Sequence, residues 1–93
     1  MYITVWASNS VTEVETISKN VSIDGLLVKS AAMIPQHTPV TFIMRVQGKH
    51  AARPVHFVGE GKIVRVENDG AAFAIAIKCT IPLTALERHL AEV

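Results

Sequence analysis

The chain has 93 residues, of which 49% are apolar, and its formal net charge is +1. This length suits one domain with its own core. The near-neutral charge excludes the strong positive field that gathers nucleic acid or anionic membrane. A single cysteine, Cys79, excludes an internal disulfide and fits a reducing compartment. We therefore expect one cytoplasmic domain over residues 1–93.

Two kinds of targeting segment are not expected. No run approaches the roughly 18 apolar residues of a membrane helix. The start MYITVWAS has neither a basic region nor a long apolar stretch, so it does not read as a signal peptide. We expect no membrane span, and no binding of DNA or RNA.

Residue usage favours strands over helices. Valine (12) and isoleucine (9) far outnumber leucine (5). β-branched side chains fit a pleated, half-buried surface and lose rotamer freedom in helices. In chain order, six segments read as strands: residues 2–7, 11–21, 26–28, 39–47, 55–67 and 71–79.

Alternation assigns faces in three of these strands. In the first strand, Ile3 and Val5 point to one face, and Tyr2, Thr4 and Trp6 point to the other. We nevertheless expect Trp6 to pack in the core. The fourth strand has the clearest pattern. Its apolar face carries Val40, Phe42, Met44 and Val46, and its polar face carries Thr41, Arg45 and Gln47. In the last strand, Phe73, Ile75 and Ile77 point inward.

Glycines mark where the strands should break or bend. Gly25 ends the second strand segment and can supply a positive φ. Gly59 and Gly61 lie inside the long fifth segment, where glycine is typical of a bulge or a sharp bend. The sequence Asn68-Asp69-Gly70 predicts a hairpin turn before the last strand.

The end of the chain changes character. Thr84 and Glu87 form a capping-box pattern. Leucines and a valine then repeat at helical spacing at positions 83, 86, 90 and 93. We expect a short helix over about residues 83–92, packed on the mouth of a barrel that covers about residues 2–79. Six short strands in succession predict an antiparallel, closed or nearly closed sheet, with a sandwich as the structural alternative.

The order of these elements resembles a PilZ domain. The segment NVSIDGLLV, residues 20–28, resembles that family's (Asp/Asn)-x-Ser-x-x-Gly motif followed by an apolar strand. The segment GKIVRVENDGAAFAIAIK, residues 61–78, is similar to the family's late hairpin. The resemblance implies an all-β, six-stranded antiparallel barrel that commonly binds the bacterial second messenger cyclic di-GMP.

The resemblance implies two clusters of ligand contacts. One is the motif segment, which here carries Asn20, Ser22 and Gly25. The other is an Arg-x-x-x-Arg pair just before the first strand, since guanidinium groups bond phosphate and guanine acceptors in a fixed fork. No such spacing occurs in this sequence, whose arginines are separated by 8, 12 and 23 positions. We therefore expect cyclic di-GMP binding to be weak or absent for this chain.

Alternatives to ligand binding remain open for the motif and for several other residues. Asn20 and Ser22 could instead hold a turn by side-chain to backbone bonds. Four basic residues could gather near one end of the barrel and supply part of the positive charge of the missing arginine pair: Lys19, Lys29, Lys62 and Arg65.

Neither metal binding nor catalysis is indicated. The four histidines have no metal-ligand spacing. Cys79 reads as a small buried residue rather than a nucleophile. The segment from Gly59 to Lys62 lacks a complete phosphate-loop spacing and reads as a bend. No resident cofactor or metal is expected, and no constellation supports an enzyme.

Two functional hypotheses follow from the sequence. The first is a non-enzymatic PilZ-type regulatory domain in cyclic di-GMP signalling, with half of its nucleotide site in this chain. The second is a degenerate PilZ domain that binds no nucleotide and acts as an adaptor between proteins. A protein partner is expected in both.

Overall fold

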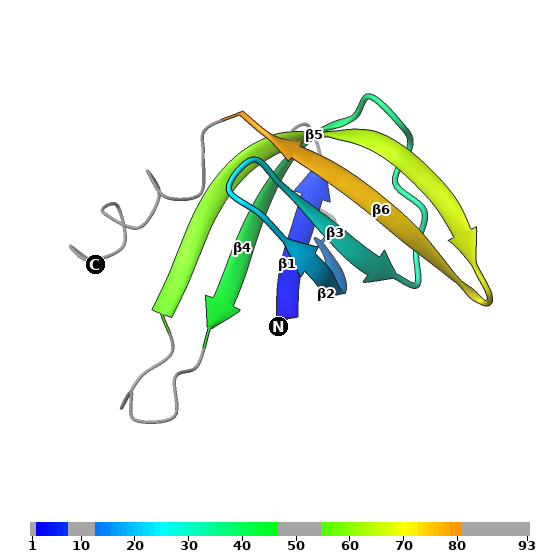
Figure 1. Cartoon of the computed structure of the whole chain (residues 1–93), viewed down its shortest axis with the longest axis horizontal. Coiled ribbons are helices and arrows are strands. Elements are labelled where there is room, and N and C mark those ends of the chain that lie inside the picture. Colours follow the sequence, from blue (N-terminus) through cyan, green and yellow to red (C-terminus); the bar gives the residue numbers. More distant parts are fainter. Residues whose placement is uncertain (1, 8–12, 47–54, 81–93) are drawn as a thin grey trace.

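The computed structural model describes residues 2–7, 13–46 and 55–80, and all the regular structure in these ranges is β-strand (Figure 1). Six strands follow in chain order: β1 (Tyr2–Ala7), β2 (Glu13–Val21), β3 (Gly25–Ser30), β4 (Pro39–Val46), β5 (Val55–Asp69) and β6 (Ala72–Cys79). The expected helix at residues 83–92 lies outside the described residues. Within the described ranges, no helix is long and apolar enough to span a membrane.

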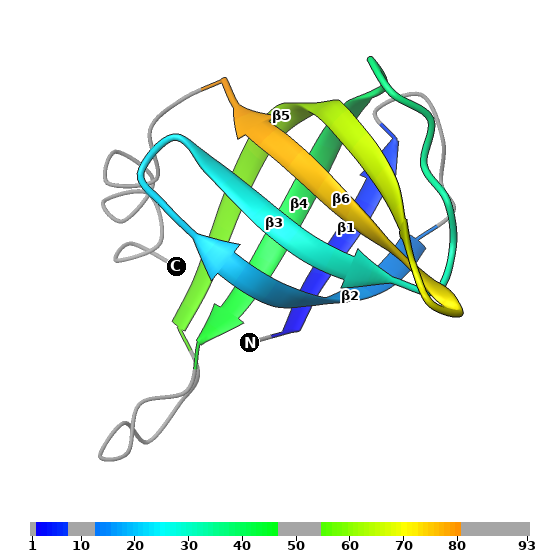
Figure 2. The ribbon, with the colours of Figure 1, turned by 45° about the vertical axis from the view of Figure 1, so that its right-hand side comes forward.

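The six strands form a closed antiparallel barrel in the order β1-β2-β3-β6-β5-β4 (Figure 2). Closure is completed by β1, which pairs with β2 on one side and with β4 on the other. The long strand β5 pairs with β4 through its first half and with β6 through its second half. The predicted barrel is confirmed, and the sandwich alternative is wrong.

The barrel interior is filled by aliphatic side chains and one phenylalanine. Phe42, Ile3, Ile63 and Ile75 are fully buried, and each contributes roughly 1.5–3 kcal/mol by leaving water. The inward faces predicted for the first, fourth and last strands are confirmed at Ile3, Val5, Val40, Phe42, Met44, Ile75 and Ile77. Trp6 differs from expectation: it is half-buried on the outer face, because β1 already directs Ile3 and Val5 inward.

Two β-bulges interrupt the ladders, neither of them at a glycine. In β2 the register shifts between Ser18 and Asn20, so Lys19 is the extra residue. In β5 it shifts between Ile63 and Arg65, so Val64 is the extra residue. The strand curves as predicted (Figure 1), but the bulge follows the glycines rather than coinciding with them.

The predicted β5–β6 hairpin is present, with its turn one residue later than expected. Asp69 pairs with Ala72, which leaves Gly70 and Ala71 as the two turn residues. Gly70 has a φ of 68°, and a positive φ at the first turn position alone is the pattern of a type II′ turn. Asn68 and Asp69 therefore continue the strand.

Candidate functional site

An open groove of about 370 Å³ lies on the outer face of the barrel, across β3 and β6. Its floor is apolar, and its rim carries an amide, a hydroxyl, a carboxylate and an ammonium group. The three residues that the motif predicted, Asn20, Ser22 and Gly25, all line this groove. The lining consists of Asn20, Ser22, Asp24, Gly25, Leu26, Leu27, Val64, Ala76, Ile77 and Lys78.

The turn between β2 and β3 places Ser22 at the rim. The Ser22 N–H donates to the carbonyl of Gly25 at 2.9 Å, and the Ser22 hydroxyl donates to the same carbonyl at 3.3 Å. The side chain therefore helps to hold the turn, as the structural interpretation of the motif predicts. Because Ser22 is also exposed, its hydroxyl oxygen remains free to accept a hydrogen bond from a ligand.

Gly25 serves close packing and not a left-handed turn. Among the described glycines, Gly70 alone has a positive φ, so the positive φ expected at Gly25 is wrong. A Cβ at Gly25 would lie 2.7 Å from the carbonyl oxygen of Ile77. Glycine is required because β3 here approaches the backbone of β6 too closely for a side chain.

The two bulges direct polar side chains onto the outer face. With a continuous register, Asn20 would lie opposite Leu26, which is buried in the core. The bulge at Lys19 moves Asn20 opposite Leu27, where its side chain is exposed at the groove. Bulges commonly re-aim a side chain in this way next to functional sites.

The second bulge acts in the same manner on the other side of the groove. Without the extra residue Val64, Arg65 would lie opposite the buried Ile75. With it, Arg65 lies opposite Ala76 in the groove floor. One outer cross-strand row therefore runs from Asn20 through Leu27 and Ala76 to Arg65.

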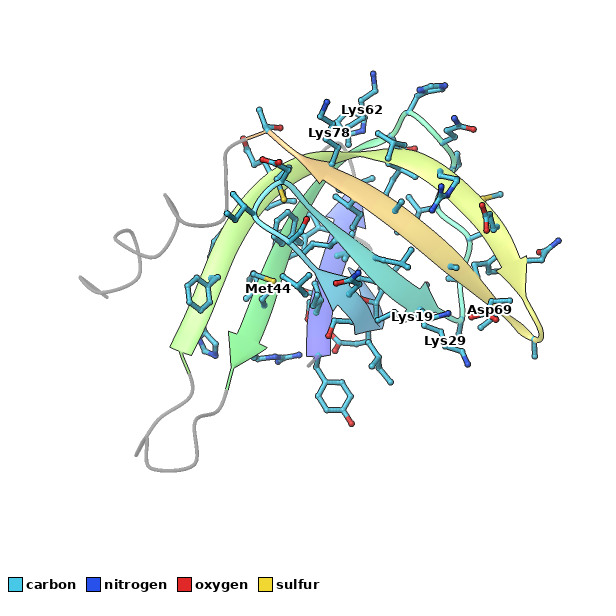
Figure 3. The ribbon with its side chains drawn as sticks, in the orientation of Figure 1. Lys19, Lys29, Met44, Lys62, Asp69 and Lys78 are labelled. Carbon is cyan, nitrogen blue, oxygen red and sulfur yellow. The ribbon has the colours of Figure 1, made fainter. Side chains whose placement is uncertain are left out.

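The four basic residues do not all gather at one end of the barrel, so this alternative from the sequence is wrong. Lys19 binds Asp69 at 2.9 Å near the β5–β6 hairpin. Lys29 lies at that same end, and Lys62 lies at the opposite end beside Lys78 (Figure 3). The pairing of the antiparallel strands explains this separation, because it places these residues at different positions along the barrel axis.

Asp24 brings a negative charge to the rim. Its carbonyl accepts the N–H of Cys79 at 2.8 Å, which joins the turn to the end of β6. Burial raises the pKa of the Cys79 thiol, and the charge of Asp24 raises it further. Both effects disfavour the thiolate, so this cysteine is poorly suited to act as a nucleophile.

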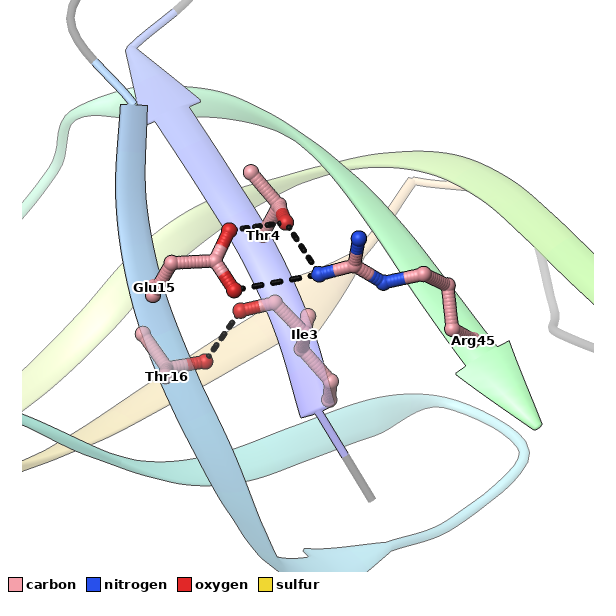
Figure 4. Close-up of polar contacts among 5 residues, drawn as sticks. All are labelled: Ile3, Thr4, Glu15, Thr16 and Arg45. Atoms are coloured by element: carbon pink, nitrogen blue, oxygen red, sulfur yellow. Dashed lines mark hydrogen bonds and ion pairs between the residues drawn. The ribbon is translucent and has the colours of Figure 1, made fainter. Parts of the chain in front are cut away.

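A second polar cluster lies on β1, β2 and β4 (Figure 4), and none of its residues lines the groove. Arg45 donates to the carboxylate of Glu15 at 3.1 Å and to the hydroxyl of Thr4 at 3.2 Å. Thr4 also donates to Glu15. Arg45 is therefore already engaged and does not replace the missing arginine pair at the groove.

The described residues hold no cluster of three His, Cys, Asp or Glu side chains that could bind a metal ion. His37 has a φ of 74°, and its N–H donates to the carbonyl of Ile63 at 2.7 Å. It therefore fixes the connection before β4 against β5. His50 and His89 lie outside the described residues.

Several residues of the groove escaped the sequence analysis. Leu27, Val64, Asp24 and Lys78 line it, but the sequence analysis assigned none of them a ligand contact. Alternation in the last strand could have placed Lys78 on the outer face, since Ile75 and Ile77 point inward. That β3 and β6 lie side by side could not be read from local sequence, because it depends on the order of strands in the barrel.

No family model matches the chain, and no curated protein matches its sequence. The solved structure of the Bacillus subtilis inhibitor of motility (MotI/DgrA) is similar to it, with a TM-score of 0.72 and 16% sequence identity. The similarity covers 98% of this chain and 45% of that protein, so the chain spans less than half of its length. At this identity, the similarity establishes a common fold.

Proposed function

We propose that this chain is a non-enzymatic regulatory domain of PilZ type, acting in the cytoplasm in bacterial cyclic di-GMP signalling. One observation carries the proposal: the three residues of the Asn-x-Ser-x-x-Gly motif, Asn20, Ser22 and Gly25, line a single outer groove. The barrel is the fold that the resemblance implies, and the structurally similar inhibitor of motility bears the name of a regulator rather than of an enzyme.

The groove offers a guanine base complementary contacts. Leu27, Val64 and Ala76 provide an apolar floor for the face of the ring. The exposed amide of Asn20 and the hydroxyl of Ser22 supply donors and acceptors for its polar edge. Gly25 keeps the backbone low enough for the ring to approach the turn.

The affinity of this chain should be low, because the forked cationic half of the site is missing. Two to four charge-assisted hydrogen bonds would be absent, each worth about 1.5–3 kcal/mol. In a protein that carries the arginine pair before β1, the nucleotide would bridge those arginines and the Asn20–Gly25 turn. The N-terminal segment would then be drawn against the barrel by a shift of population toward the closed arrangement.

Calorimetry with cyclic di-GMP tests the proposal. We expect a dissociation constant no tighter than about 1 μM, weakened at least threefold by Ser22→Ala or Asn20→Ala. The matched control is Asn68→Ala, since Asn68 is exposed on β5 near the hairpin. Cyclic di-AMP is the ligand control, because it lacks the guanine edge. Submicromolar affinity would contradict the weight given to the missing arginine pair, and equal effects of Asn20→Ala and Asn68→Ala would contradict the assignment of the site to this groove.

A second candidate function is an adaptor that binds another protein and no nucleotide. It is favoured by exposed apolar side chains on the outer face, where Tyr2 (63% exposed) and Ile17 (50% exposed) lie directly opposite each other. Tyrosine is enriched among residues that dominate interface energies. If millimolar cyclic di-GMP shifts no backbone amide resonance of the groove in an NMR titration, the adaptor function is preferred.

A further inference from the structure

The outer face of β5 and β6 carries an unusual juxtaposition of like charges. Lys62 and Lys78 are directly opposite each other in the register, and both side chains are exposed. Figure 3 shows them together at the same end of the barrel. Directly opposed like charges destabilise a sheet, so this pair is better explained by an anion that it attracts than by folding.

These two ammonium groups lack an acidic partner among the described residues. The three ion pairs found there join Lys19 to Asp69, Arg45 to Glu15 and Arg65 to Glu67. Asp24 also lines the groove, but it forms no ion pair with either lysine within the described part of the chain. The positive charge at this end of the groove therefore remains available.

Close packing fixes the backbone from which Lys78 projects. On one side, a Cβ at Gly25 would lie 2.7 Å from the carbonyl oxygen of Ile77. On the other side, a Cβ at Gly61 would lie 2.6 Å from the carbonyl oxygen of Lys78 itself. Strands β3 and β5 thus hold this part of β6 tightly from both sides, which positions Lys78 at the rim.

Arg65 adds a third cation on the adjacent outer row. The bulge at Val64 places Arg65 opposite Ala76, two residues before Lys78 on β6. Diagonal neighbours of this kind lie about 7–8 Å apart at their backbones, within reach of one anion for long side chains. Its Nε is 3.1 Å from Glu67 Oε1, and both side chains of this ion pair are exposed, so the pair is weak and can be exchanged.

We propose that Lys62, Lys78 and Arg65 form a phosphate-binding subsite at the end of the groove. This inference rests on the proposed function, because the subsite binds the phosphate of the nucleotide whose guanine base contacts Leu27 and Ala76. Strands β5 and β6 then provide part of the positive charge that the forked arginine pair before β1 would supply. A groove of about 370 Å³ is near the lower end of the range for small-molecule pockets, which suits one nucleotide unit with one phosphate group.

Comparing guanosine with guanosine 5′-monophosphate isolates the contribution of the phosphate. In NMR titrations of the whole chain at low salt, we expect the monophosphate to bind at least threefold more tightly than guanosine. The double variant Lys62→Gln/Lys78→Gln should remove most of that difference, because Arg65 alone remains. Lys29→Gln is the matched control, because Lys29 is exposed on the outer face at the opposite end, and it should retain the difference.

The outcomes separate the two proposals. If guanosine shifts the Leu27 and Ala76 resonances but the monophosphate binds no more tightly, the subsite is wrong and the groove assignment stands. Equal losses in the double variant and in Lys29→Gln would also overturn the subsite, because general electrostatics would then account for the preference. If neither compound shifts those resonances at millimolar concentration, the proposed nucleotide function itself fails.

Discussion

The two ends of the β5–β6 strand pair differ in how glycine and lysine are used. At the hairpin end, Gly70 lies in open space with a φ of 68°, and Lys19 from β2 is paired with Asp69. At the groove end, Gly61 is enclosed by the backbone and side chains of β6. There, Lys78 lines the groove and lies opposite another lysine.

This difference separates residues that serve the fold from residues available for binding. Near the hairpin, Gly70 and Lys19 each have an internal explanation: the glycine makes the turn, and the lysine neutralises Asp69. Near the groove, the glycine is explained by close packing, but the charges are not explained by any contact among the described residues. The groove end is therefore where a ligand would contribute most.

The largest loss of stability should come from adding a side chain at the enclosed Gly61. A Cβ at Gly61 would lie 2.6 Å from the carbonyl oxygen of Lys78 and 2.8 Å from Cγ2 of Ile77. Gly61→Ala should lower the free energy of unfolding by about 1–3 kcal/mol, since the backbone of a packed barrel must shift. Urea denaturation measures the change.

Gly70→Ala is the matched control for this variant. A Cβ at Gly70 would have no atom within 4 Å. The variant should therefore lower the free energy of unfolding by about 1 kcal/mol, through the left-handed conformation alone. If both alanine variants lose the same stability, the groove end is no more tightly packed than the hairpin, and the comparison fails.

A smaller effect should appear in the dependence of stability on pH in the acidic range. The hydrogen bond and positive charge of Lys19 lower the pKa of Asp69 below its usual 3.8, with a smaller contribution from Lys29. The resulting stabilisation is present above the unfolded-state pKa and is lost as pH falls through the lower folded-state pKa. Lys19→Gln should therefore lower Tm by no more than about 2 °C at pH 6.

The same variant should show no deficit once Asp69 is protonated. Thermal melts at pH 6 and at the lowest pH that the fold tolerates measure this convergence, with Lys62→Gln as the control that leaves the Lys19–Asp69 pair intact. A deficit of equal size at both pH values would mean that Lys19 stabilises the bulge by packing and not by charge.

The smallest effect, and the opposite sign, is expected at the groove end. Lys78→Gln removes the repulsion with Lys62, so stability at low salt should stay unchanged or rise by up to about 0.5 kcal/mol. The gain should vanish in 0.5 M NaCl, where exposed charges are screened. Loss of stability at low salt would reveal an internal partner for Lys78 and remove the argument for an external anion.

Local pattern predicted much of the barrel. The alternation of apolar and polar residues correctly predicted the inward faces of β1, β4 and β6. Gly70 predicted the position of the β5–β6 turn to within one residue. Alternation did not predict that Thr4 is buried (7% exposed) on the outward face of β1. Arg45 and Glu15 cover it, and both come from neighbouring strands.

The groove was harder to predict than the strands that form it. The motif identified Asn20, Ser22 and Gly25, but the bulges at Lys19 and Val64 leave no local signal. A bulge is defined by the partner strand, so it becomes visible only when the register of β2 with β3 and of β5 with β6 is known. For the same reason, the proximity of Lys62 and Lys78 followed from pairing and not from composition.

Closure of the barrel has a consequence for how a partner protein could be recruited. Each of the six described strands is hydrogen-bonded to a neighbour on both sides, and β1, β3, β4 and β6 are paired on both sides over nearly their whole length. Recognition by adding a strand to an exposed sheet edge is therefore excluded for these four strands, whereas β2 and β5 are paired on both sides over only part of their length. A protein that recognises the four fully paired strands must contact their outward side chains, and a change in those side chains alters recognition without altering the hydrogen-bonded framework.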